Sequence, residues 1–267
     1  MPLFHDQMHR HIEIPAKPQR IISIVPSQTE LLFDLGLDAA IIGITKYCIH
    51  PGEKVKQKIK IGGTKELDIN LIKSLKPDLI IGNKEENERS PVEELMQHFP
   101  VWMSDISDLE SALDMVSKVG EITDCATHAQ DLITRITQQF NKLTIKPSNH
   151  LSIKPSQNRV AYFIWRKPYM VAGKGTFIDD MLKKFGLINV FEAERYPEIT
   201  SVQLQTVNPD FVLLSSEPYP FKEKHIHEFQ ALLPNATIKV VDGEMFSWYG
   251  SRLLQAPDYF EQLFDNQ

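Results

Sequence analysis

His50 and Arg252 have side chains that could bind a metal or an anionic ligand. An imidazole can ligate cobalt, haem iron or zinc, so His50 is a candidate ligand contact, with a loop histidine without a metal as the alternative. Arg252 can meet a carboxylate or phosphate of a ligand, or cap a neighbouring backbone segment. The sequence contains neither a Gly-x-Ser-x-Gly nor a His-Glu-x-x-His motif, so no local motif indicates catalysis.

The composition is that of a folded protein without an excess of positive charge. Of the 267 residues, 42% are hydrophobic and 24% are charged, which argues against a disordered chain. The 29 Lys and Arg residues face 35 Asp and Glu residues, so we expect no nucleic-acid partner. Two cysteines, Cys48 and Cys125, are too few for a disulfide scaffold or a Cys-rich zinc module.

The apolar runs and the N-terminal residues bear on location. No apolar run approaches the ~20 residues of a membrane-spanning helix, so we expect no membrane insertion. The first 20 residues contain three histidines and several charges and lack the features of a secretory signal. As the sequence stands we expect a cytoplasmic protein, or a periplasmic one if an upstream signal was removed.

The N-terminal third has the pattern of a β-α-β unit. An apolar run at 20–25 predicts a buried strand, and Ser27-x-x-Glu30 has the spacing of a capping box that begins a helix. The apolar run 40–44 follows, and a strand, helix and strand in this order imply a parallel sheet. Residues 45–65, which contain Tyr47 and His50, lack periodicity and are predicted to form a long loop.

The most regular pattern lies in the middle of the chain. Apolar residues recur at steps of three or four from Leu109 to Leu143, which predicts a helix. Unbroken, it would span about 54 Å at ~1.5 Å per residue. Gly120 and Thr123-Asp124 could mark a kink, so two helices remain an alternative. Residues 144–158 contain two prolines and three serines, and we predict a linker there.

A segment is repeated in the two halves of the chain. A short helix, a Pro-Asp pair and an apolar strand occupy 70–81 and again 201–212, with Pro77 and Pro209 separated by 132 residues. A repeat of this length predicts two α/β lobes, whereas one continuous sheet with two similar turns is the alternative. We predict an N-terminal lobe at 1–106, a connecting helix at 107–146 and a C-terminal lobe at 147–267.

Several longer stretches together resemble a known family. They are RIISIVPSQTELLFDLGL, GITKYCIHP and IGGTKELDINLIKSLKPDLIIG in the first half, and KPYMVAGKGTFIDDMLKKFG, ERYPEITSVQLQTVNPDFVLL and DGEMFSWYGSRLLQAPDYF in the second. In order and spacing they resemble the helical-backbone (class III) periplasmic substrate-binding proteins of ABC importers for cobalamin, haem and iron-siderophores. The resemblance covers about residues 18–264 and looks closest to the cobalamin-binding type.

The resemblance implies a fold and a binding function. The fold is α/β, with two Rossmann-like lobes containing parallel sheets, joined by one long backbone helix, and with the ligand held in the cleft between the lobes. The implied protein is not an enzyme, requires no cofactor and has no metal site of its own. Its candidate ligand is cobalamin, or another metal-tetrapyrrole or iron chelate.

The resemblance also implies aromatic ligand contacts, because aromatic faces suit a large, partly apolar macrocycle. Tyr47, Tyr169 and Tyr196 match by position, and Trp165, Trp248 and Tyr249 lie in loops expected to face the same cleft. All six could instead be ordinary core or surface aromatics. The predicted ligand-binding residues are therefore Tyr47, His50, Trp165, Tyr169, Tyr196, Trp248, Tyr249 and Arg252.

Two departures from the family pattern affect the ligand and the partner. Glu66 stands where the cobalamin-binding type has Trp. Family members also carry an exposed Glu on each lobe that docks on permease arginines, and counting from the Pro-Asp pairs places these positions at Ile72 and Val202, which cannot form that ion pair. Glu66, Asp68 or Glu198 are the possible substitutes. We expect a monomer, with an ABC transporter permease as the possible protein partner.

Two alternative functions are compatible with the residues alone. One is a cytoplasmic tetrapyrrole-handling enzyme of chelatase type, in which His50 with Glu66 or Glu244 handles metal or protons. The other is an orphan intracellular cofactor-binding module without transporter docking.

Overall fold

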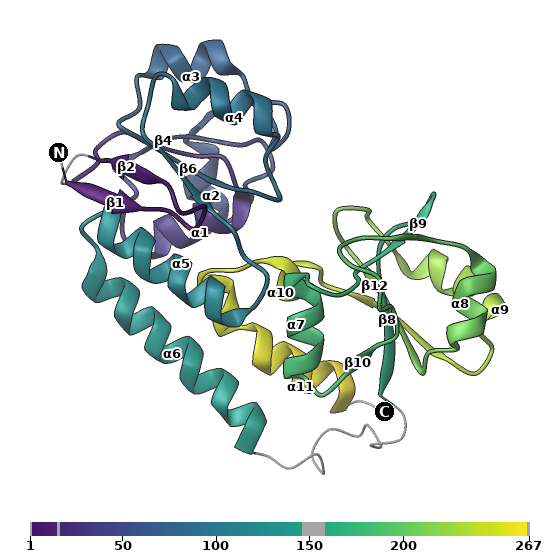
Figure 1. The fold of residues 1–267 in the computed structure, drawn as a ribbon. Coiled ribbons are helices and arrows are strands. Elements are labelled where there is room, and N and C mark those ends of the chain that lie inside the picture. The colour runs from purple at the N-terminus through teal and green to yellow at the C-terminus, as the bar shows by residue number, and fades with distance from the viewer. Residues whose placement is uncertain (1, 15–16, 146–157, 266–267) are drawn as a thin grey trace. The chain divides into compact units, whose positions relative to one another are not determined.

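The computed structural model describes residues 2–14, 17–145 and 158–265, which form two compact units (Figure 1). Unit 1 contains the described residues up to Ile106, together with Glu110–Ile136 and Tyr249–Arg252. Unit 2 contains Ser107–Leu109 and the rest of the described chain. None of the helices in these ranges combines the length and the apolar character needed to cross a bilayer.

Unit 1 is built on a five-stranded sheet in which all neighbouring strands are parallel, as the sequence predicts. In spatial order the strands are β5 (Ile59–Lys60), β4 (Ile41–Ile44), β3 (Ile21–Ser23), β6 (Leu79–Asn83) and β7 (Val101–Ser104). Numbered within the sheet along the chain, this order is 3-2-1-4-5, the arrangement of Rossmann-type sheets. The order reverses between β3 and β6.

Helices cover both faces of this sheet. They are α1 (Pro26–Asp34), α2 (Gly52–Lys56), α3 (Ile69–Leu75), α4 (Arg89–Met96) and α5 (Leu109–Ile122). Apolar residues of α3 and α4 pack with those of β3, β6 and β7 in one core, and α1 packs on β3 and β4. Helix α1 begins at Pro26 without a side-chain cap, so the predicted start at a Ser27 capping box was wrong; proline at the first helical position leaves no N–H to satisfy there.

The structure corrects two further predictions in this region. The predicted loop 45–65 contains α2 and β5, which are five and two residues long and too short to show periodicity. The single connecting helix is instead two consecutive helices, α5 and α6 (Ala126–Ile145), separated at Thr123–Cys125, which confirms the alternative of a break near Gly120 and Thr123-Asp124.

The break between α5 and α6 has a local cause. Asp124 has φ +60°, a conformation that ends a helix, and the Cys125 N–H donates to the Gly120 carbonyl at 2.7 Å. A Cβ built on Gly120 would lie 2.3 Å from the Cβ of Ala129 in α6. Glycine therefore allows the two helices to approach closely, and the chain passes from unit 1 to unit 2 within α6.

Unit 2 contains a mixed sheet rather than the purely parallel one predicted. Its strands are β8 (Arg159–Trp165), β9 (Tyr169–Val171), β10 (Ile188–Asn189), β11 (Glu198–Ile199), β12 (Phe211–Ser215) and β13 (Thr237–Val241). The order is β11-β9-β8-β12-β13, with β10 also paired to β8. Strands β8, β10, β12 and β13 are parallel, whereas β9 is antiparallel to β8 and β11. Only three residues join β8 to β9, a connection that antiparallel strands alone allow.

The helices of unit 2 also lie on both faces of its sheet. They are α7 (Phe177–Lys184), α8 (Ser201–Val207), α9 (Ile226–Leu232), α10 (Glu244–Ser247) and α11 (Ala256–Asp265), with short 3₁₀ turns at Glu223–His225 and Ser251–Leu254. Apolar residues of α8 and α9 share one core with the sheet. On the opposite face, the rings of Tyr162 and Phe211 contact Phe246 and Phe264 of α10 and α11. The predicted linker at 144–158 lies largely outside the described residues.

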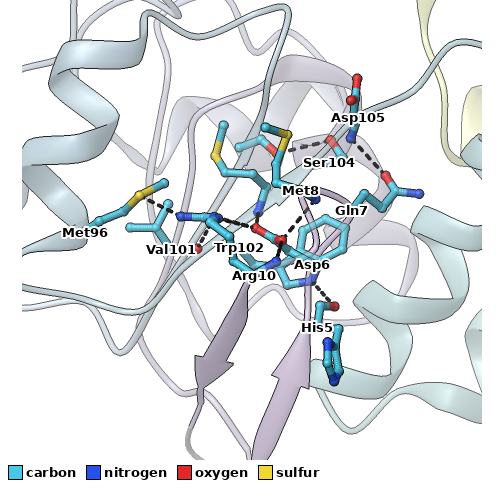
Figure 2. Close-up of polar contacts among 12 residues, drawn as sticks. His5, Asp6, Gln7, Met8, Arg10, Met96, Val101, Trp102, Ser104 and Asp105 are labelled. Atoms are coloured by element: carbon cyan, nitrogen blue, oxygen red, sulfur yellow. Dashed lines mark hydrogen bonds and ion pairs between the residues drawn. The ribbon is translucent and has the colours of Figure 1, made fainter.

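The N-terminal residues form a hairpin of β1 (Leu3–His5) and β2 (His11–Glu13), paired antiparallel. Its turn is organised by the buried carboxylate of Asp6, which accepts hydrogen bonds from the backbone N–H groups of Met8 and Arg10 at 3.0 and 2.8 Å (Figure 2). The Arg10 side chain also pairs with Asp6 and donates to the Val101 carbonyl at 3.0 Å. The hairpin is thereby attached to strand β7.

Candidate functional site

Ligands in open α/β sheets bind beyond the carboxyl ends of the strands, where the strand order reverses. In unit 1 this point lies between β3 and β6, and in unit 2 the corresponding central strands are β8 and β12. The loops after β3, β4, β6, β8 and β12 are therefore the candidate binding loops. Tyr47 and His50 follow β4, and Trp165 ends β8.

A network of buried polar side chains holds the loops at this edge of unit 1. Gln28 and Asn83 both donate to the Ser104 hydroxyl, at 2.5 and 3.0 Å. Asn87 donates to the carbonyls of Ile24 and Thr64 at 3.0 and 2.9 Å, which connects three loops. The buried members of this network are Gln28, Asn83, Asn87 and Ser104, and a second hydrogen-bonded group consists of Ser23, Thr29, Thr45 and Cys48. Sequence reasoning missed this network, although the positions of Ser and Asn after apolar strands are a signal for it.

Tyr47 and Ile49 extend from the loop after β4, with 55% and 53% of their surfaces exposed. Cys48 between them is buried, with its thiol within 3.2 Å of the hydroxyls of Thr29 and Thr45. Burial raises the pKa of the Cys48 thiol, so this thiol anchors the loop as a neutral group. Its neighbours on either side remain exposed. Ile49 was not among the predicted contacts.

A glycine allows the Tyr47 ring to rest on the next loop. A Cβ built on Gly63 would lie 3.1 Å from Cε2 of Tyr47, closer than nearly all real contacts of this kind. The preceding Gly62 has φ +100° and would place a Cβ 2.3 Å from the Glu66 carbonyl. Gly62 is therefore required at its position, whereas Gly63 lets the exposed Tyr47 ring lie close to the backbone of this loop.

Arg252 and Glu30 form a buried ion pair within unit 1. The guanidinium donates twice to the Glu30 carboxylate, at 3.0 and 2.5 Å. Burial raises the pKa of Glu30, an increase that the positive charge of Arg252 opposes. His50, which is half-buried and precedes a cis proline, adds a smaller opposing effect on that pKa and so belongs to the same region. Arg252 thus attaches Tyr249–Arg252 to α1. From the sequence, the expected partner of Arg252 was a ligand anion or a backbone segment, and Glu30 was not included.

In unit 2, Trp165 is the exposed aromatic residue at the carboxyl end of β8, with 39% of its surface accessible. Its ring lies edge-on against Tyr219, with centroids 5.6 Å apart, and its indole N–H donates to the Lys167 carbonyl at 3.2 Å. Tyr219 follows β12, so the two rings come from loops after adjacent parallel strands. Tyr219 was not predicted.

Tyr169 is engaged by a carboxylate. Its hydroxyl donates to Glu228 at 2.5 Å, and the other oxygen of Glu228 accepts two hydrogen bonds from Arg166. Burial and the bond to Glu228 raise the pKa of Tyr169 to about 12. The phenol is therefore held as a hydrogen-bond donor to Glu228, and its ring packs against Phe163 and Phe229.

Trp248 is buried, with its indole N–H donating to Glu217 at 2.8 Å. The same oxygen of Glu217 accepts a hydrogen bond from Ser247 at 2.9 Å. Burial raises the pKa of Glu217, and the nearby carboxylate of Glu244 adds to the increase. Tyr249, the next residue, is buried in unit 1.

Tyr196 is half-buried, and the Arg195 guanidinium lies 5.9 Å from its ring centroid, within range of a cation–π contact.

The eight predicted contacts differ in exposure. Tyr47 and Trp165 are exposed, His50, Tyr169 and Tyr196 are half-buried, and Trp248, Tyr249 and Arg252 are buried. Among the described residues, no group of three or more His, Cys, Asp or Glu side chains is arranged to hold a metal ion.

The predicted docking position Ile72 was wrong. Its side chain is fully buried in the core of unit 1, whereas Val202 is 68% exposed. With the 132-residue offset of the repeat, Ile72 corresponds to Leu204, which is also fully buried, and Val202 corresponds to the exposed Asn70. Counting from the Pro-Asp pair without the helix register therefore placed one position on the wrong side of α3.

Comparison with protein families supports the resemblance inferred from the sequence. Residues 21–232 match the family described as periplasmic binding protein. The chain is similar to the vitamin B12-binding protein of Pectobacterium atrosepticum, with 24% identity over 246 residues that cover 90% of this chain and 86% of the relative. The vitamin B12-binding protein of Yersinia pseudotuberculosis is 22% identical over 208 residues, covering 76% of this chain and 72% of the relative.

Solved structures share the fold. The periplasmic vitamin B12-binding protein BtuF of Vibrio cholerae superimposes with a TM-score of 0.76 and 20% identity, covering 95% of this chain and 100% of the other. A periplasmic haem-binding protein of Pseudomonas aeruginosa gives a TM-score of 0.77 at 21% identity, with 92% of each chain covered. The molybdate-binding protein MolA of Haemophilus influenzae gives 0.81 at 12% identity, covering 98% and 91%.

Proposed function

Because the chain belongs to the periplasmic binding protein family, we propose that it is a non-enzymatic ligand-binding protein that serves as the substrate-binding component of an ABC importer. The observation that carries this proposal is the position of exposed apolar side chains. Tyr47 and Ile49 in unit 1 and Trp165 in unit 2 all follow parallel strands at their carboxyl ends. Side chains of this kind lose little conformational entropy when a ligand covers them.

The proposed ligand is cobalamin, or another metal-tetrapyrrole or iron chelate. The relatives and solved structures reported above are named for binding vitamin B12, haem or molybdate, which favours a binding function over the chelatase-like alternative. A broad, partly apolar ligand suits exposed aromatic faces flanked by hydroxyl and cationic groups. Lys46, whose ammonium lies 5.2 Å from the centre of the Tyr47 ring, and Arg166 beside Trp165 supply such cations.

The predicted site residues divide into two roles in this proposal. Tyr47 and Trp165 are the principal ligand contacts, because their rings are exposed. Tyr196 and His50 are secondary contacts, because both are half-buried; His50 lies in the loop after β4 and Tyr196 in the segment between β10 and β11. Tyr169, Trp248, Tyr249 and Arg252 hold the binding loops in place, since three are buried and Tyr169 is bonded to Glu228.

The test is direct titration of the purified protein with cyanocobalamin, haemin and a ferric siderophore, followed by calorimetry and tryptophan fluorescence. We expect saturable binding of one of these ligands with a Kd below about 100 μM, equivalent to roughly −5.5 kcal/mol. Absence of saturation for all three ligands at that concentration would overturn the proposed ligand class. A visible absorbance spectrum of the fresh protein also shows whether a corrin or haem is retained.

Docking to a permease is the second part of the proposal. Glu66 and Glu198 are both exposed, are separated by the 132-residue offset, and lie two residues before the residues that cap α3 and α8. They are exposed acidic residues at equivalent positions of the two units, so we propose that they replace the docking glutamates expected at the helices. This role places the protein in the periplasm or at the outer face of a membrane.

The docking proposal is tested with charge reversal. Glu66→Lys and Glu198→Lys should each weaken capture of the cognate permease complex at least tenfold while leaving ligand affinity unchanged. Glu121→Lys, at an exposed position of α5, is the matched control and should bind the permease as the unmodified protein does. Equal capture by all three variants would show that docking does not use this acidic pair.

A further inference from the structure

Two histidines face each other on the N-terminal hairpin. His5 of β1 is directly opposite His11 of β2, and both side chains are exposed. Their ring centroids are 4.2 Å apart, and the ring planes are inclined by 56°. The hairpin precedes residues 21–232, so this pair lies outside the residues that match the family model.

The strand pairing brings these two side chains close together. In an antiparallel ladder, hydrogen-bonded and non-hydrogen-bonded pairs alternate, and the latter have the closer side chains. The Asp6 N–H donates to the Arg10 carbonyl at 3.1 Å, and the Ile14 N–H donates to the Pro2 carbonyl at 3.2 Å. These bonds identify 6–10 and 2–14 as hydrogen-bonded pairs, so His5 and His11 form a non-hydrogen-bonded pair.

The backbone that carries the histidines is held in place from beneath. The Trp102 indole N–H donates to the His5 carbonyl at 3.2 Å, and the Gln7 amide donates to the Ser111 carbonyl and to Asp114, each at 2.8 Å. Figure 2 shows the His5 ring directed away from the Asp6 and Arg10 network that forms the turn. The backbone that carries the imidazoles is therefore fixed, while the imidazoles themselves make no bonds in that network. A fixed backbone reduces the entropy lost when the two imidazoles bind a shared ligand.

The ring separation suits two imidazoles bound side by side to one metal ion. With a metal–nitrogen bond of about 2.0–2.1 Å, each ring centroid lies about 3.2 Å from the metal. Two rings at right angles about the metal then have centroids about 4.5 Å apart, and two rings at the tetrahedral angle about 5.2 Å apart. The observed 4.2 Å is nearer the first value. Tetragonal coordination by nitrogen and oxygen is typical of Cu²⁺ and Ni²⁺, with Cu²⁺ bound more strongly.

We propose that His5 and His11 form a two-histidine surface site for a divalent transition metal of tetragonal preference, Cu²⁺ ahead of Ni²⁺. Solvent completes the coordination, in keeping with the lack of a third ligand in the described residues. Glu13 shares the exposed face of β2 with His11 and contributes a favourable negative charge nearby. The site is independent of the proposed ligand and of its loops.

The test is calorimetric titration of the full chain with Cu²⁺ in the presence of a weak competing chelator, together with electron paramagnetic resonance of the complex. We expect one ion per chain and a tetragonal spectrum with hyperfine coupling to two imidazole nitrogens. His5→Gln and His11→Gln should each weaken binding at least tenfold and leave at most one coupled nitrogen. His9→Asn is the matched control, because it removes an imidazole from the same hairpin at a position with φ +60°, which asparagine tolerates.

The outcomes separate clearly. Affinity within twofold of the unmodified protein for both His5→Gln and His11→Gln would overturn the proposal, as would an equal loss for His9→Asn. Both paired histidines are exposed, so their variants should unfold at the same temperature as the unmodified protein without metal. An unchanged unfolding temperature with lost Cu²⁺ binding assigns the loss to the imidazoles themselves.

Discussion

The amino-terminal edges of the two sheets are nearly copies of each other. Arg20 in unit 1 donates its side chain to the Leu75 carbonyl at the end of α3, and its backbone N–H to Asp78 at 2.9 Å. Arg159 in unit 2 donates to the Val207 carbonyl at the end of α8, and its backbone N–H to Asp210 at 2.9 Å. The acceptors in each pair are 132 residues apart.

The carboxyl-terminal edges differ. In unit 1 the loops are held by a buried network of hydroxyl and amide groups with the Glu30–Arg252 ion pair beside it. In unit 2 they carry aromatic side chains, with Trp165 against Tyr219, and the ion pair of Arg166 with Glu228. Unit 2 also adds the antiparallel strand β9.

This contrast separates two kinds of requirement on the duplicated lobe. The amino-terminal edge must satisfy backbone hydrogen bonds, whereas the carboxyl-terminal edge must suit a ligand. The turn from helix to strand must satisfy the last helical carbonyls and the first strand N–H, so the same Arg and Asp recur. The loops at the other edge have no such shared requirement, and they are free to differ where a ligand binds. Variants that act differently on the two edges test this interpretation.

The largest effect is expected for the buried ion pair of unit 1. Arg252→Ala leaves the Glu30 carboxylate buried without its partner and should lower the free energy of unfolding by about 3–5 kcal/mol. Urea denaturation followed by circular dichroism measures this. The double variant Glu30→Gln with Arg252→Met should recover part of the loss, because it removes both charges.

The corresponding helix of unit 2 provides the comparison. Asp179 of α7 is also buried, yet it is bonded both to Asn189 at 3.1 Å and to the partly exposed Lys183. Lys183→Ala should therefore cost no more than about 1 kcal/mol. A loss for Lys183→Ala as large as that for Arg252→Ala would contradict the view that the two edges are stabilised differently.

A smaller but still large effect is expected on ligand binding, and this prediction rests on the proposed function. Tyr47→Ala and Trp165→Ala should each weaken the ligand by about 2 kcal/mol, roughly 30-fold, because exposed aromatic contacts dominate such sites. Ile188→Ala is the matched control, since Ile188 is 55% exposed but pairs with Arg159 at the amino end of β8. Titration calorimetry of the three variants checks the prediction, and an equal loss for Ile188→Ala would rule out a site at the carboxyl ends.

The amino-terminal edges were the more predictable part of the molecule. The Pro-Asp pairs and apolar strands signal their turns directly, because proline and left-handed caps act over a few residues. The parallel sheet of unit 1 and the α/β class followed from the same local patterns. The break after α5 was left as an alternative, since Gly120 shows its role only when Ala129 of the next helix lies against it.

The carboxyl-terminal edges were less predictable because their contacts join distant parts of the sequence. Nothing near Arg252 in sequence indicates Glu30, which lies 222 residues earlier. Exposure also depends on register, so Ile72 was placed on the surface although α3 turns it into the core. The eight predicted ligand contacts remain predictions, and the structure adds Ile49 and Tyr219 as neighbours that share their loops.

A moderate effect is expected at the start of the repeated helices. Asp68 caps α3 by accepting from the Leu71 N–H, whereas Thr200 caps α8 in a reciprocal capping box with Gln203. Asp68→Ala and Thr200→Ala should each lower the free energy of unfolding by about 1 kcal/mol. The larger loss is expected for Thr200, whose hydroxyl also donates to the Gln203 side chain at 3.0 Å. Hydrogen exchange of the first turn in each variant gives the measurement, and an unchanged rate in either helix would show that its cap contributes nothing.

The smallest effect distinguishes the ends of the same two helices. Lys76 and Asn208 both adopt the left-handed conformation, with φ +47° and +44°. Asparagine tolerates this conformation better than lysine, so Lys76→Gly should raise the free energy of unfolding by about 0.5 kcal/mol and Asn208→Gly should change it by about zero. The gain is limited because glycine also increases the entropy of the unfolded chain. Paired urea midpoints measure the difference. A larger gain for Asn208→Gly than for Lys76→Gly would contradict the view that residue type sets the strain of these two left-handed positions.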